Sequence, residues 1–136
     1  MTVETSSYGM RVRTPHSYED AVRATREALQ QQGFGVLTEI DVRKTMREKL
    51  GIEHAPYLIL GACNPRLAHQ ALEAEREIGL LLPCNVIVYE EGGGSVVAAV
   101  DPVKALAAVI QNPALAEVAP QVRGKLEAAL RAVAEA

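Results

Sequence analysis

The sequence predicts an α+β fold in which about five strands form a sheet and helices pack against it. Segments with strand-like patterns alternate with segments whose apolar residues recur at helical spacing. Turn and capping residues separate these segments, and no linker or change of composition divides the chain, so we expect a single domain over residues 1–136. Hydrophobic residues make up 49% and charged residues 23%, with no low-complexity tract, which is typical of a protein with a packed core.

The first part of the chain predicts two strands and two helices. Apolar residues alternate with other residues over 8–13, which indicates a strand with one buried face. Ser17 is a suitable N-cap for an amphipathic helix that ends at Gly33. A second strand follows at 35–40, and Asp41 caps a short helix that ends at Gly51.

The middle of the chain predicts a strand, a helix and a hairpin. The apolar run 57–60 forms the third strand, and Asn64 followed by Pro65 is a cap and first residue for a helix that closes at Gly79. Residues 85–89 and 95–100 are strands joined by a glycine-rich turn, so they should form a hairpin.

The C-terminal part predicts three helices that start at prolines. Asp101-Pro102 begins a helix that runs through Ile110, Asn112-Pro113 begins a short one, and Pro120 begins the last amphipathic helix.

Two of the predicted strands carry large apolar side chains at successive positions, Leu58-Ile59-Leu60 and Val86-Ile87-Val88. Successive residues of a strand point to opposite faces, so both faces of the sheet should be dry there. If the long helices cover one face, then the short helices, a bound ligand or a second copy of the protein must cover the other.

Two similar Cys-Asn pairs, Cys63-Asn64 and Cys84-Asn85, lie next to predicted strands. Cys63 precedes the start of a helix, where the partial positive charge lowers the pKa of a nearby thiol if the geometry allows. The alternative is that each cysteine is a small buried apolar side chain, and that Asn64 serves only as a cap. In a reducing compartment we expect free thiols rather than a disulfide.

Several classes of function are disfavoured. The net charge of −3 and the scarcity of aromatic residues argue against a nucleic-acid binder. No signal peptide or membrane-spanning run is visible, so we expect a cytoplasmic protein without membrane contact. The three histidines do not have the spacing of metal ligands, and we expect no metal site. No catalytic motif identifies a reaction or a cofactor, so the sequence leaves open whether the protein is an enzyme.

Three segments, 35–41, 57–65 and 79–86, resemble those of the bacterial and archaeal domain-of-unknown-function family 302. The resemblance spans roughly Tyr8 to Ile110 and implies a curved antiparallel sheet with helices on one side, like half of the TATA-binding protein, of order β-α-β(4)-α with extra short helices. It implies no activity. The residues that carry the motif here are Asp41, Gly61, Cys63, Asn64, Pro65, Pro83 and Cys84.

These observations predict a homodimeric ligand-binding or assembly domain. The candidate ligand-binding residues are Cys63, Asn64, Pro65, Cys84, Asn85 and Asp41. The alternative is a thiol-dependent protein for redox sensing, sulfur handling or soft-metal capture that uses Cys63 and Cys84.

Overall fold

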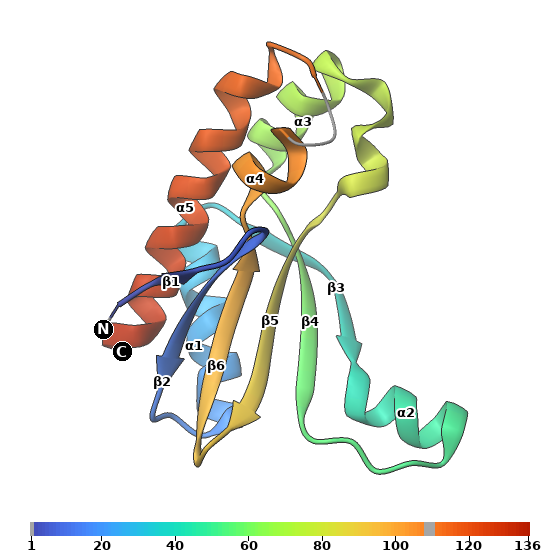
Figure 1. Cartoon of the computed structure of the whole chain (residues 1–136), viewed down its shortest axis with the longest axis vertical. Helices are drawn as coiled ribbons and strands as arrows, with labels where there is room; N and C mark the ends of the chain where they lie inside the picture. The colour runs from blue at the N-terminus through green and yellow to red at the C-terminus, as the bar shows by residue number, and fades with distance from the viewer. Residues whose placement is uncertain (1, 108–110) are drawn as a thin grey trace.

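The computed structural model describes residues 2–107 and 111–136. It contains a six-stranded antiparallel sheet of order β1-β2-β6-β5-β4-β3 (Figure 1). The strands are β1 (Glu4–Thr5), β2 (Gly9–Thr14), β3 (Gly35–Asp41), β4 (Tyr57–Cys63), β5 (Cys84–Glu91) and β6 (Gly94–Val100). The helices are α1 (Tyr18–Gln31), α2 (Val42–Leu50), α3 (Pro65–Ala74), the 3-10 helix η1 (Arg76–Leu81), α4 (Pro102–Ala107) and α5 (Leu115–Glu135).

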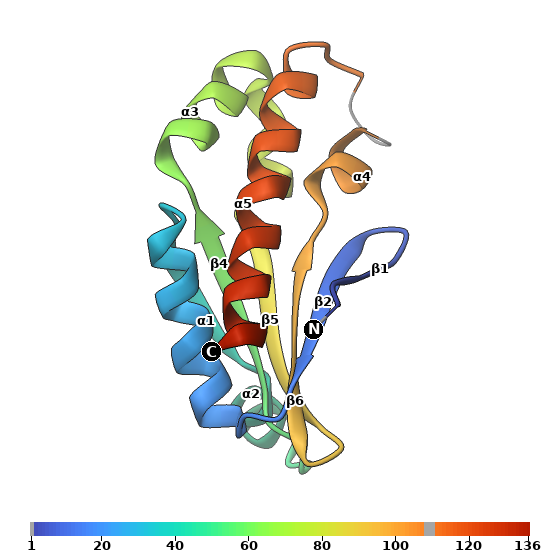
Figure 2. The same cartoon turned by 90° about the vertical axis from the view of Figure 1, so that its left-hand side faces the viewer.

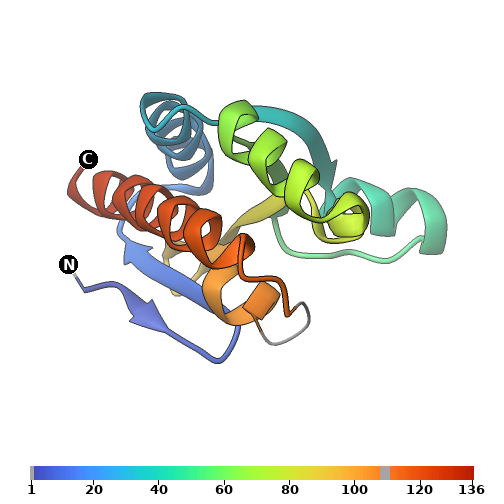
Figure 3. The same ribbon diagram turned by 90° about the horizontal axis from the view of Figure 1, so that it is seen from above.

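The long helices α1 and α5 lie side by side on one face of the sheet (Figure 2). The main core lies between these helices and the inward residues of the central strands, which include Leu60, Val88 and Val97. A second apolar cluster joins α3, η1 and the start of α5 beyond the end of the sheet. The other face of the sheet has no helix over its centre in the described part of the chain, and α2 lies beyond the β3 edge (Figure 3). We call this surface the open face.

Local signals place most of these elements where the sequence predicts them. The Ser17 side chain accepts from the backbone N–H of Asp20 at the start of α1, and Asp41 accepts from Lys44 at the start of α2. Gly51 ends α2 in the left-handed conformation that glycine adopts without strain. The predicted hairpin is β5–β6, and both of its turn glycines, Gly92 and Gly93, have positive φ, as such tight turns require.

Two predictions about the sheet and the helix after Asn64 were incomplete. The sheet has a sixth strand, β1, whose two residues are too few to show a pattern. The helix after Asn64 ends at Ala74 rather than near Gly79, because Glu75 is extended and the chain continues as η1, which buries Ile78. The Asn112 side chain donates to the last carbonyl of α3, that of Ala74, at 2.7 Å.

The last helix does not begin at Pro120 but at Leu115, so the proline lies inside α5. A proline interrupts the backbone hydrogen bonds of a helix. Burial of Leu115 and Val118 against the second cluster compensates, since both side chains are less than 10% exposed. The separate short helix predicted from Asn112 is therefore absent, and the predicted extension of α4 to Ile110 lies outside the described residues.

No helix in the described part of the chain combines the length and the apolar character needed to cross a membrane.

Candidate functional site

The antiparallel pairing of β4 and β5 brings the two Cys-Asn pairs to the same end of the sheet. Cys63 is the last residue of β4 and Cys84 is the first of β5, and Ala62 lies directly opposite Cys84. Both cysteines are half-buried thiols in the structure. The chain thus places Cys63 and Cys84 next to each other although 20 residues separate them in sequence.

The two asparagines have different positions. Asn64 caps α3, since its Oδ1 accepts from the backbone N–H of Leu67 at 3.3 Å. Asn85 is the second residue of β5, so its side chain points to the face opposite that of Cys84 and is exposed on the open face. The apparent repeat of the Cys-Asn pair therefore does not produce two equivalent sites.

The other two candidate residues lie outside the group formed by the two cysteines and Asn64. Pro65 occupies the first position of α3 and is exposed. Asp41 caps α2 and pairs with Leu58, five residues along β4 from Cys63, or about 17 Å away. Asp41 cannot contact a ligand that sits against the cysteines unless the ligand is very long, and the structure shows its side chain as the cap of α2.

A cavity of about 310 Å³ lies beside the cysteines, between the end of the sheet and the helices α3, α4 and α5. Its wall contains no charged side chain from the described residues, and its most polar residues are Cys63, Asn64 and Cys84. The apolar residues that line it include Phe34, Leu67, Ala68, Leu82, Leu106 and Val122.

Burial raises the pKa of the Cys84 thiol to about 11, and the neighbouring Cys63 adds to this shift. Loss of hydration disfavours the charged thiolate, so Cys84 is a neutral thiol at physiological pH. The reactive species in thiol chemistry is the thiolate. Cys84 therefore contributes a weakly polar, uncharged group to the cavity wall.

The open face carries an apolar row across the central strands. Pairing registers align Ile40 with Ile59, Ile59 with Ile87, and Ile87 with Ala98. The same row continues on β2 and β1 with Arg11 and Glu4. β4 and β5 thus carry large apolar side chains on both faces, because Ile59 and Ile87 lie opposite the helices. That the open face is dry stays a prediction.

Three of the four tyrosines gather on the open face around a trough of about 530 Å³. Tyr57 and Tyr89 are directly paired on β4 and β5, and their rings stack with centroids 5.5 Å apart. Tyr8 comes from the loop between β1 and β2 and is 71% exposed. Burial raises the pKa of Tyr57, and the nearby hydroxyls of Tyr89 and Tyr8 add to this shift. Sequence reasoning missed this group, although Tyr57 and Tyr89 each lie two residues from an open-face isoleucine and so share its face.

Charged residues border one side of the trough. Arg11 and Arg13 both donate to the Glu4 carboxylate, at 3.3 and 3.1 Å, and Arg13 also pairs with Glu91. These hydrogen bonds lower the pKa of Glu4, which stays ionised. These ion pairs therefore contain two acidic and two basic side chains, of which Glu4 and Arg11 line the trough.

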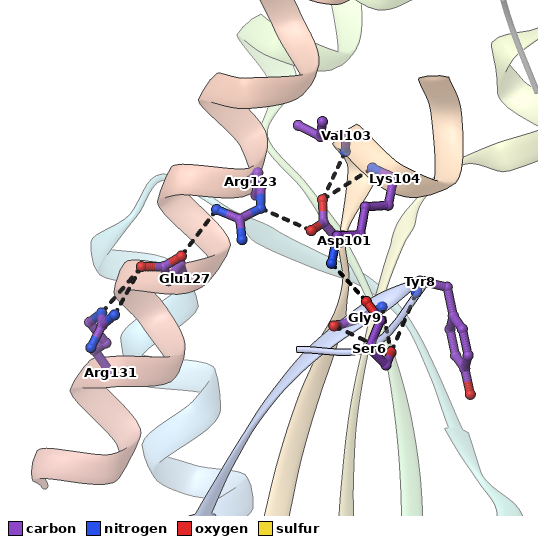
Figure 4. A network of polar contacts seen from close by, with 9 residues as sticks. All are labelled: Ser6, Tyr8, Gly9, Asp101, Val103, Lys104, Arg123, Glu127 and Arg131. Carbon is purple, nitrogen blue, oxygen red and sulfur yellow. Dashed lines mark hydrogen bonds and ion pairs between the residues drawn. The ribbon is translucent and has the colours of Figure 1, made fainter. Parts of the chain in front are cut away.

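A polar network connects the trough to the cavity (Figure 4). Asp101 is fully buried; its Oδ1 accepts from the first backbone N–H groups of α4, and its Oδ2 accepts from Arg123 of α5 at 2.9 Å. The Asp101 N–H donates to the carbonyl of Tyr8, and Lys104 donates to the carbonyl of Ser6. Helix α4, which contributes Pro102 and Leu106 to the cavity wall, is thereby attached to the loop that carries Tyr8.

Within residues 2–107 and 111–136, no three histidine, cysteine or acidic side chains come together as metal ligands.

Comparisons with known proteins agree on one family. A family model described as "Domain of unknown function DUF302" matches residues 10–133. The crystal structure of an uncharacterized conserved DUF302 protein from Bacillus stearothermophilus is 30% identical to this chain, covers 94% of it and 99% of its own length, and superposes with a TM-score of 0.86. No curated protein matches the chain.

Proposed function

Because the chain belongs to the DUF302 family, whose description assigns no activity, we propose from its geometry that it is an assembly domain that forms a homodimer through the open face. The observation that carries this proposal is the aromatic and apolar surface formed by Ile59, Ile87, Tyr57 and Tyr89. It lies at the centre of a sheet face that no helix of residues 2–107 and 111–136 covers. Apolar surface of this kind gains free energy when a partner removes it from water.

The composition of the open face supports a protein partner. Tyrosine and arginine are enriched among the residues that dominate binding energy at protein interfaces. Interfaces also have an apolar centre and a polar rim. Here Ile87 lies at the centre, and the ion pairs of Glu4, Arg11 and Arg13 lie at the side.

The charges favour a second copy over a different partner. A twofold interface places the same surface on both subunits, so it must be complementary to itself. The border carries Glu4 and Glu91 with Arg11 and Arg13, and a rotated copy can set acids against bases. A strongly acidic or basic partner would meet side chains of both signs in these ion pairs, so charge attraction would not favour it.

Sedimentation velocity of the wild type and of Ile87→Lys tests this proposal. We expect the wild type to sediment as a dimer throughout the micromolar range and Ile87→Lys to sediment as a folded monomer, since lysine carries a charge into the centre of the contact. The matched control is Leu80→Lys, because Leu80 is 83% exposed on η1 and lies away from the open face. A monomeric wild type, or equal dissociation in both variants, would refute the proposal; far-ultraviolet circular dichroism confirms folding.

The thiol-dependent alternative has less support. A cytoplasmic location, as the sequence predicts, would keep both thiols reduced. The raised pKa of Cys84 disfavours a reactive thiolate at that position. Alkylation rates measured against pH decide the matter, because a thiolate formed below pH 8 at either cysteine would support this alternative.

A further inference from the structure

We infer that the cavity beside Cys63 and Cys84 is a binding site for a small, uncharged and mainly apolar molecule with a hydrogen-bond acceptor. This site is separate from the proposed dimer surface, since the cavity lies on the helix side of the sheet end and the trough lies on the open face.

The size and walls of the cavity define the class of ligand. A volume of about 310 Å³ is within the range of small-molecule sites. Apart from Cys63, Asn64 and Cys84, its walls are mainly aliphatic side chains and Phe34, so the apolar part of a ligand gains free energy when it leaves water for this site. A ligand with a charge would be buried without a partner, because no charged side chain of the described residues lines the site.

The polar groups of the wall specify the orientation of the ligand. Cys84 is a neutral thiol and offers only a weak donor. Asn64 uses its carbonyl oxygen in the α3 cap, and its amide nitrogen has no hydrogen-bond partner among the described residues. That nitrogen can donate to a carbonyl, hydroxyl or ether oxygen. A ligand with one such acceptor would be held with this oxygen at Asn64 and its apolar part among Leu67, Leu106 and Val122.

A pair of fluorescent probes tests the preference for an uncharged ligand. N-phenylnaphthylamine is neutral, and anilinonaphthalene sulfonate adds a sulfonate to the same ring system. We expect the wild-type protein to bind the neutral probe with a blue-shifted emission and the anionic probe at least about tenfold more weakly, because the anion would lose its hydration without gaining a partner. Equal affinities, or no binding of the neutral probe, would overturn the inference.

Two substitutions of alanine by phenylalanine locate the site. Ala68→Phe puts a ring into the cavity from α3, and we expect it to weaken binding of the neutral probe at least about tenfold. Ala116→Phe is the matched control, since Ala116 is exposed on α5 and does not line the cavity. Equal affinities in the two variants would place the probe elsewhere.

Protection of a thiol by the bound probe gives a second measurement. It uses a variant whose cavity is not filled by an added ring. In Cys63→Ser, Cys84 is the only cysteine, and its alkylation by N-ethylmaleimide can be timed with and without the neutral probe. When the concentration of the neutral probe is ten times its dissociation constant, mass action predicts that alkylation of Cys84 is slower by a factor of about 11. An unchanged rate would overturn the inference. Sedimentation does not depend on this result, so the dimer and the ligand site can fail separately.

Discussion

Substitution of Asp101 should destabilise the fold in two separable steps. Asp101→Asn keeps an oxygen that can accept from the α4 backbone but removes the charge that faces Arg123. A hydrogen bond to a charged group contributes about 1.5–3 kcal/mol. Arg123 is 31% exposed and retains its pair with Glu127, so we expect a loss near the lower end, about 1–2 kcal/mol.

Asp101→Ala also removes the cap of α4. The cap accepts from Val103 at 3.0 Å and from Lys104 at 3.3 Å, and loss of such a cap costs about 1 kcal/mol. The total loss should then be about 2–3 kcal/mol. Against a typical stability of about 5–15 kcal/mol, both variants should remain folded.

Urea unfolding followed by circular dichroism measures these differences. The matched control is Arg131→Leu, which removes an exposed ion pair to Glu127 and should change stability by less than about 0.5 kcal/mol. If Asp101→Asn were as stable as the wild type, the ion pair to Arg123 would contribute nothing. If Asp101→Asn and Asp101→Ala were equally stable, the cap would contribute nothing, and the reasoning above would be refuted.

Three further predictions concern backbone space and pH. Gly61→Ala should lose about 1–3 kcal/mol in urea unfolding, because a Cβ there would collide with the side chains of Thr38 and Pro83, whereas Gly79→Ala meets open space and should be neutral. Between about pH 9 and 11, Cys84 ionises in the unfolded chain but not in the folded one. The free energy of unfolding of the wild type should therefore fall by about 2–3 kcal/mol relative to that of Cys84→Ala over this range. If the free energies of unfolding of the two proteins changed equally with pH, the raised pKa would be contradicted. Because the pKa of Glu4 is lowered in the fold, the pairing of β1 with β2 should persist above pH 4.5 and weaken as the pH falls below it. Amide exchange at Ser6, whose N–H donates to the Gly9 carbonyl, would report this, and Glu4→Gln should remove the pH dependence.

Local chemistry made much of the fold predictable. At the helix caps Ser17, Asp41 and Asn64, a side-chain oxygen accepts from a backbone N–H three residues further on. A few adjacent residues are therefore enough to predict where these helices start. The glycine pair 92–93 likewise defines its own turn.

Predictions failed where distant packing outweighed local signals. Pro120 indicates a helix start, but the burial of Leu115 and Val118 against α3 and η1 extends α5 in front of it. The hydrophobic pattern after Asn64 continues to Ile78, yet the backbone changes direction at Glu75. The position of a proline or the spacing of apolar residues carries no information on contacts with segments that are about 40 residues away in the sequence.

The candidate site depends on the order of the strands. Cys63 and Cys84 are adjacent because β4 pairs with β5, and the separation of Asn85 from Cys84 depends on strand alternation that the Cys-Asn repeat concealed. The tyrosine trough needed the sheet order, because Tyr8 and Tyr57 become neighbours only when β1 and β2 join the far edge of the sheet.

The central claim is that Ile59 and Ile87 of one subunit contact the open face of another. Isotope-filtered NOE spectroscopy on a mixture of labelled and unlabelled protein detects only contacts between subunits. We predict cross-peaks from the methyl groups of these isoleucines to tyrosine rings of the partner. A sample that sediments as a dimer but shows such cross-peaks only at Leu72, Leu80 or Leu81, which are exposed on α3 and η1, would contradict it.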